Sequence, residues 1–156
     1  MATPIFLTHM TNEEFDLPGD WLTVPAEDDN GALVIVTGRT DVAKFRDNPR
    51  FNIRLSVRWR YGDAGMPDTD VSTMMQTVTE MLAKEFKKDP VAVLTGIYTG
   101  AGLREWVFYT LSLPIFGRKL NETLAALPVL PLEISAESDA DWDEYAEMRQ
   151  VVNSVE

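Results

Sequence analysis

The 156-residue sequence contains no cysteine and a single histidine, His9. The absence of cysteine excludes disulfide bonds, thiolate metal sites and a cysteine nucleophile. It also fits a reducing compartment, where disulfides are rare. The lone histidine lies in an N-terminal stretch without a clear hydrophobic period, so we expect no histidine-based catalytic site.

Long hydrophobic runs are missing too, although 45% of the residues are hydrophobic, enough for a folded core. No stretch is long enough to span a bilayer, and the first residues lack the basic segment of a secretory signal. We therefore expect a cytoplasmic protein without a membrane segment. The length predicts a single domain, which we place over residues 20–156. Residues 1–19 show no clear hydrophobic period and are expected to form an N-terminal arm.

Basic residues are few, with 14 Lys and Arg against 25 Asp and Glu and a formal charge of −11. The two ends are acidic, because residues 1–38 carry −7 and residues 137–156 carry −6, whereas residues 39–136 carry +2. Such a field repels nucleic acids and anionic membranes, so neither is an expected partner.

The first part of the domain, residues 20–50, is predicted to form a hairpin and a short helix. Two β-rich runs, 21–25 and 32–39, flank Asn30-Gly31, a pair typical of hairpin turns. In the stretch 40–49, Thr40 is expected to cap a short helix and Pro49 to follow its end.

Residues 51–136 show the order β-α-β-β-α-β, which predicts an α+β, ferredoxin-like unit. Both helices are then expected on one face of an antiparallel sheet whose strand order is fourth, first, third, second. The predicted elements are strands at 51–61, 91–99, 103–111 and 129–136 and helices at 69–88 and 114–127. An acidic helix over residues 137–156 follows, with Trp142, Tyr145 and Val152 along one side.

The strand FNIRLSVRWRY, residues 51–61, alternates apolar and polar side chains. If Phe51 to Tyr61 point at the helices, then Arg54, Arg58 and Arg60 point to the open face of the sheet. In the predicted strand order, Glu105 and Glu133 flank these arginines from the neighbouring strands, and Tyr109 shares the same face. We take Arg54, Arg58, Arg60, Glu105, Tyr109 and Glu133 as the candidate binding surface.

Three interpretations of this surface stay open. Opposite charges on neighbouring strands attract each other, so the arginines and glutamates can form a cross-strand ladder without a ligand. Alternatively, guanidinium groups can bind an anion or a protein partner. As a third option, the terminal helix or the hairpin folds over the face and buries Trp21 or Trp142 there.

Other functions find less support in the residues. Asp139, Asp141 and Asp143 alternate like the start of a calcium loop, but Glu144 and Gln150 occupy the positions that need glycine and glutamate. No serine has a recognisable partner base, and no cofactor, metal site or catalytic residue is expected. RNA binding through the sheet requires exposed aromatic residues on its central strands, and only Tyr109 is predicted there.

Three stretches, RWRYGDAGMPD, LTGIYTGAGLREWVFYT and DADWDEY, resemble in order and spacing a bacterial family known as domain of unknown function 695. The similarity runs from about Trp21 to Tyr145. The family brings no established activity, cofactor or catalytic residue. A looser, fold-level similarity links it to the ribonuclease E inhibitor B family, which is ferredoxin-like, and implies regulation by protein contact.

From these observations we expect a small binding or regulatory module that acts through protein contact. The alternative is an anion-binding protein or an enzyme that uses the arginine-bearing face. The sequence leaves open whether the protein is a monomer or a homodimer.

Overall fold

The fold is described from a computed structural model, which covers residues 3–4, 10–11 and 19–153. Most of the predicted N-terminal arm, including His9, therefore lies outside the described residues. Its two described pieces are short strands, β1 (Thr3–Pro4) and β2 (Met10–Thr11), and both pair with β3.

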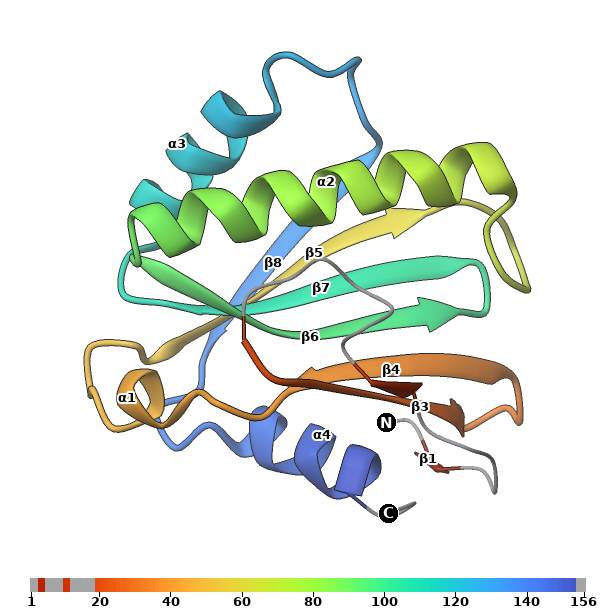
Figure 1. Cartoon of the computed structure of the whole chain (residues 1–156), viewed down its shortest axis with the longest axis horizontal. Coiled ribbons are helices and arrows are strands. Elements are labelled where there is room, and N and C mark those ends of the chain that lie inside the picture. Colours follow the sequence, from red (N-terminus) through yellow and green to blue (C-terminus); the bar gives the residue numbers. More distant parts are fainter. Residues whose placement is uncertain (1–2, 5–9, 12–18, 154–156) are drawn as a thin grey trace.

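An antiparallel sheet runs through the molecule (Figure 1). Its strands lie in the order β1-β3-β4-β6-β7-β5-β8. The long strands are β3 (Trp21–Glu27), β4 (Leu33–Arg39), β5 (Ile53–Arg60), β6 (Ala92–Gly100), β7 (Leu103–Thr110) and β8 (Leu132–Ser138). The α+β class is confirmed, and β8-β5-β7-β6 follows the strand order predicted for residues 51–136. The β3–β4 hairpin extends this sheet beyond β6.

Helices cover both faces of the sheet. Figure 1 shows α2 (Thr69–Lys88) and α3 (Leu113–Leu124) on one face and α1 (Ala43–Arg46) and α4 (Asp143–Asn153) on the other. We call these the α2 face and the α4 face. Of the two segments considered as covers for the open face, the terminal helix takes that role, while the hairpin joins the sheet.

Local capping sets the helix boundaries. α2 begins and ends as predicted, because the Asp68 side chain accepts a hydrogen bond from the N–H of Val71 and Pro90 follows the end. α3 is capped by Ser112 and ends at Leu124, three residues before the predicted end. The predicted Thr40 cap is wrong. The Thr40 hydroxyl donates to the carbonyl of Asp20, and the short helix begins after Val42.

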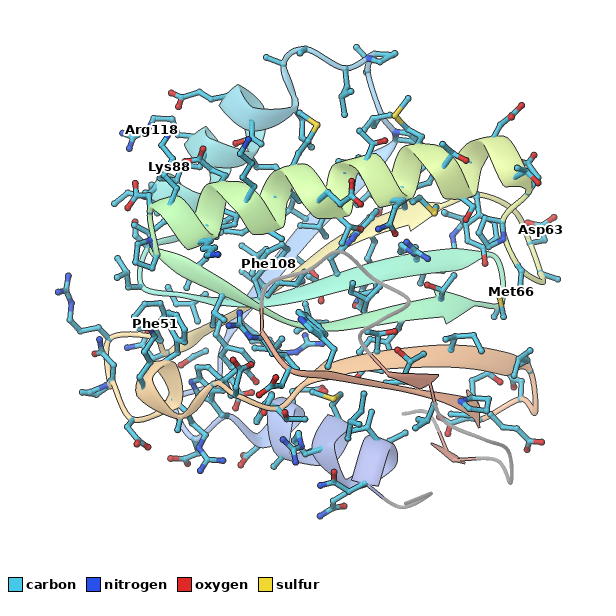
Figure 2. The ribbon with its side chains drawn as sticks, viewed as in Figure 1. Phe51, Asp63, Met66, Lys88, Phe108 and Arg118 are labelled. Atoms are coloured by element: carbon cyan, nitrogen blue, oxygen red, sulfur yellow. The ribbon has the colours of Figure 1, made fainter. Side chains whose placement is uncertain are left out.

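Each face of the sheet has its own hydrophobic core. Leu55, Val57 and Trp59 of β5 pack against the α2 side, as the alternation predicts. Phe51 was expected on the same side, but it precedes β5 and lies in the other core, edge-on to Phe45 of α1. Figure 2 shows this separation, with Phe108 beneath α2 and Phe51 beside α1. Phe51 therefore packs on the α4 face of the sheet, whereas the apolar residues of β5 that follow it pack on the α2 face.

Within residues 3–4, 10–11 and 19–153, no helix has the length and apolar character needed to cross a bilayer.

Candidate functional site

The strand β5 positions the three arginines of the candidate surface. Because its apolar residues face α2, Arg54, Arg58 and Arg60 point to the α4 face. The register places Arg58 opposite Glu105 on β7 and opposite Glu133 on β8. The two glutamates therefore flank Arg58 as the alternation predicts.

Carboxylates contact two of the three arginines. Arg58 Nε lies 3.1 Å from Glu105 Oε2. Arg54 reaches Glu137 at 3.5 Å and Glu144 of α4 at 3.9 Å, and its side chain is only 13% exposed. Arg60 is exposed and has no ion pair among the described residues, and the same is true of Glu133. The ladder thus forms around Arg54 and Arg58 but does not include every charge on the surface.

Tyr109 does not belong to an accessible surface. It faces α4 as predicted, but its ring is fully buried and stacks on Trp142, with ring centroids 3.9 Å apart. Its hydroxyl donates to Asp139 Oδ2 at 2.6 Å. Burial first, and then this bond to a carboxylate, raise the pKa of Tyr109. The expectation that Tyr109 is available for binding is therefore wrong, because α4 covers it.

The acidic segment before α4 serves to dock this helix. Asp139 accepts hydrogen bonds from the N–H groups of Asp143 and Glu144, so it satisfies donors at the start of α4. Trp142 Nε1 donates to the carbonyl of Phe51 at 2.7 Å. No group of three Asp, Glu, His or Cys side chains that could hold a metal ion occurs in the part of the chain that the structure describes.

A groove remains between α4 and the uncovered part of the sheet. Its volume is about 660 Å³, and Arg54, Arg58 and Arg60 form part of its wall. Five carboxylates outnumber these three arginines, and they are Asp28, Glu105, Glu137, Glu144 and Glu147. Tyr98 also lines the groove, where burial first and then Glu144 and Glu105 raise the pKa of its phenol. The groove is thus a mixed-charge site with an excess of acid.

The strand β8 borders this arrangement at the edge of the sheet. It pairs only with β5 among the described residues, and all its residues except Leu132 are exposed. Ile134, which the strand alternation places on the α2 face, is 45% exposed. The predicted strand order already places this strand at an edge of the sheet, but sequence reasoning did not single out the edge as a candidate site. The strand continues to Ser138, two residues beyond its predicted end, through an acidic, serine-containing run.

These features define a two-faced α+β domain with a mixed-charge groove and one open sheet edge. The model of the family of unknown function DUF695 matches residues 20–148, most of the chain, which confirms the resemblance of the three sequence stretches. The chain therefore belongs to the DUF695 family. Searches of curated proteins and of solved structures found no match.

Proposed function

We propose that this chain is a cytoplasmic binding module that acts through protein contact, and that an extended basic segment of a partner pairs with the edge of β8. The observation that carries the proposal is the open edge itself. An edge strand presents unpaired N–H and C=O groups, which an extended segment can satisfy by adding a strand.

The charges beside this edge favour a basic partner. Glu133 and Glu137 lie on the α4 face, opposite Arg58 and Arg54 of β5, and both are exposed. An added strand places its own side chains beside these glutamates, where lysine or arginine forms favourable cross-strand pairs. On the other face, Ile134 offers apolar surface to the alternate side chains. The expected partner segment therefore alternates basic and apolar residues.

A second copy of this chain suits the edge less well. If two β8 strands pair in antiparallel fashion about Ser135, the register that uses the whole strand, Glu133 of each copy lies opposite Glu137 of the other. Like charges placed directly opposite each other destabilise a strand pair. The groove also supports a basic partner rather than an anion, because its carboxylates outnumber its arginines.

The element order and the strand order β8-β5-β7-β6, with α2 and α3 on one face, also support a ferredoxin-like class for residues 51–136. In that arrangement β8 is the edge strand, which is the position the proposed contact requires.

A defined peptide tests the proposal. The full chain is titrated with a synthetic peptide in which lysine and valine alternate, and amide hydrogen exchange is measured by NMR. We expect slower exchange at alternate amides of β8, because a new strand satisfies their outward N–H groups. Replacing lysine by glutamate in the peptide should abolish this effect.

Two double variants separate specific pairing from general attraction. Glu133→Lys with Glu137→Lys should weaken binding about tenfold, because two cross-strand pairs become repulsive. Glu27→Lys with Asp47→Lys changes the net charge equally at exposed residues on other elements and should leave affinity close to that of the native chain. Equal losses in both variants, or protection outside β8, contradict the proposal. A dimer of the free protein that protects β8 contradicts the choice of partner.

A further inference from the structure

A second pocket lies on the α2 face, away from the groove and from β8. Its volume is about 230 Å³, and it is bordered by the first half of α2, the loop before α2, and strands β4, β6 and β7. Figure 2 shows Met66, which lines this pocket, on the loop at the end of the molecule where α2 begins. The pocket is too small for most drug-sized ligands but has room for a molecule of a few heavy atoms.

Arg104 of β7 supplies the charge of this pocket. The side chain is partly buried, and its Nε donates to Thr99 Oγ1 of β6 at 2.8 Å. The guanidinium carbon lies 5.8 Å from the ring centroid of Trp106, so an aromatic face supports it from one side. Burial lowers the pKa of Arg104 to about 10, which leaves the group charged at neutral pH.

This arginine lacks the partner that others in the chain have. Arg39, Arg54, Arg58 and Arg118 each lie within 4.0 Å of a carboxylate. Arg104 forms no ion pair within the described ranges, and Nε is its only nitrogen with a hydrogen bond there. A partly buried guanidinium that lines a pocket and has no carboxylate partner is a candidate position for an external anion.

The remaining walls indicate what kind of anion fits. Hydroxyl groups of Thr99 and Ser72 border the pocket and can donate to an oxyanion. Ile35, Ile97 and Met66 provide apolar walls for a short hydrocarbon body. Gln76 also lines the pocket, but its Nε2 donates to Glu80 Oε1 at 3.1 Å. Arg104 is the only charged residue that lines the pocket, and it balances one negative charge.

We infer that the pocket around Arg104 binds a small aliphatic carboxylate, with the carboxylate on the guanidinium fork and the hydrocarbon body against the apolar walls. A planar guanidinium matches the two oxygens of a carboxylate in a bidentate pair. The site is independent of the proposed contact at β8, because it lies on the other face of the sheet and shares none of the residues on which that contact depends.

The test is an NMR titration of the full chain with butyrate, with inorganic phosphate as a second arm and sodium chloride of equal ionic strength as the reference. We expect saturable shifts for butyrate at Thr99 and Arg104, including the Arg104 Nε–H resonance. Absence of saturable shifts at these residues overturns the proposal. Tighter binding of phosphate at the same residues overturns the assignment to a carboxylate.

Variants locate the binding. Arg104→Gln and Arg104→Lys should each weaken butyrate binding by about tenfold or more, because both remove the bidentate charged pair. Arg104→Lys keeps the positive charge, so its effect separates the loss of bidentate geometry from the loss of charge. Arg50→Gln is the matched control, since Arg50 is an exposed arginine outside the pocket and outside the groove. Unchanged affinity in Arg104→Lys, or an equal loss in Arg50→Gln, overturns the assignment.

Discussion

The packing of α4 on the sheet depends on Trp142, so Trp142→Ala is the most informative single change. The indole is 1% exposed, stacks on Tyr109 and meets Tyr145 edge-on with ring centroids 5.5 Å apart. Truncating a buried tryptophan to alanine costs about 3–5 kcal/mol, because transfer free energy is lost and a cavity remains. The free energy of unfolding of a domain is only about 5–15 kcal/mol, so this loss is large.

Trp142→Phe divides this cost into its parts. Phenylalanine keeps an aromatic ring against Tyr109 but removes the N–H that donates to the carbonyl of Phe51. We expect a loss of about 1–3 kcal/mol, since a buried carbonyl then lacks its partner. The order of stability should be native, Trp142→Phe, Trp142→Ala.

Urea unfolding followed by far-UV circular dichroism measures these values. The far-UV signal is preferable to fluorescence, because three other tryptophans contribute to the emission. Leu33→Ala serves as a control, since this side chain is 44% exposed and should change stability by about 0.5 kcal/mol or less. A cost below about 1 kcal/mol for Trp142→Ala would refute the view that this side chain docks α4.

Three further predictions follow from particular contacts. Thr79→Val should destabilise the protein by about 1–3 kcal/mol in urea unfolding, because the buried Trp106 Nε1 loses the hydroxyl acceptor at 2.8 Å, whereas Thr79→Ser should retain that bond. Gly102→Ala should lower the free energy of unfolding more than Gly31→Ala in the same assay. Both residues have positive φ, but of the two only Gly102 lies where a new Cβ collides with backbone, at Gly62. Equal losses in the two variants would contradict this. The pKa of Tyr109 is raised in the folded state, so its contribution to stability is present below pH 10 and declines as the pH rises above 10. Tyr109→Phe should therefore be less stable than the native chain at pH 7. Above pH 10 the variant should lose less stability than the native chain does.

Sequence reasoning located part of the candidate site because strand side chains alternate. Once the strand order was inferred, counting residues along β5, β7 and β8 was enough to place Glu105 and Glu133 on either side of Arg58. The same counting placed Tyr109 on the correct face but could not show that it is covered. Cover depends on a segment 30 residues further along the chain, through the bond from Tyr109 to Asp139.

The sequence by itself determined the local elements, since periodicity and capping act over a few residues. The bounds of α2 follow from such short-range rules, and so does the placement of Leu55, Val57 and Trp59 on one side of β5. Tertiary structure alone decided that Phe51 packs with α1, that α4 closes over Tyr109, and that Ile134 of the predicted edge strand β8 stays exposed. It also brought Arg104 into a pocket with Thr99 and α2. These outcomes depend on which distant surfaces bury each other, and a local pattern shows only that a side is apolar, not what covers it.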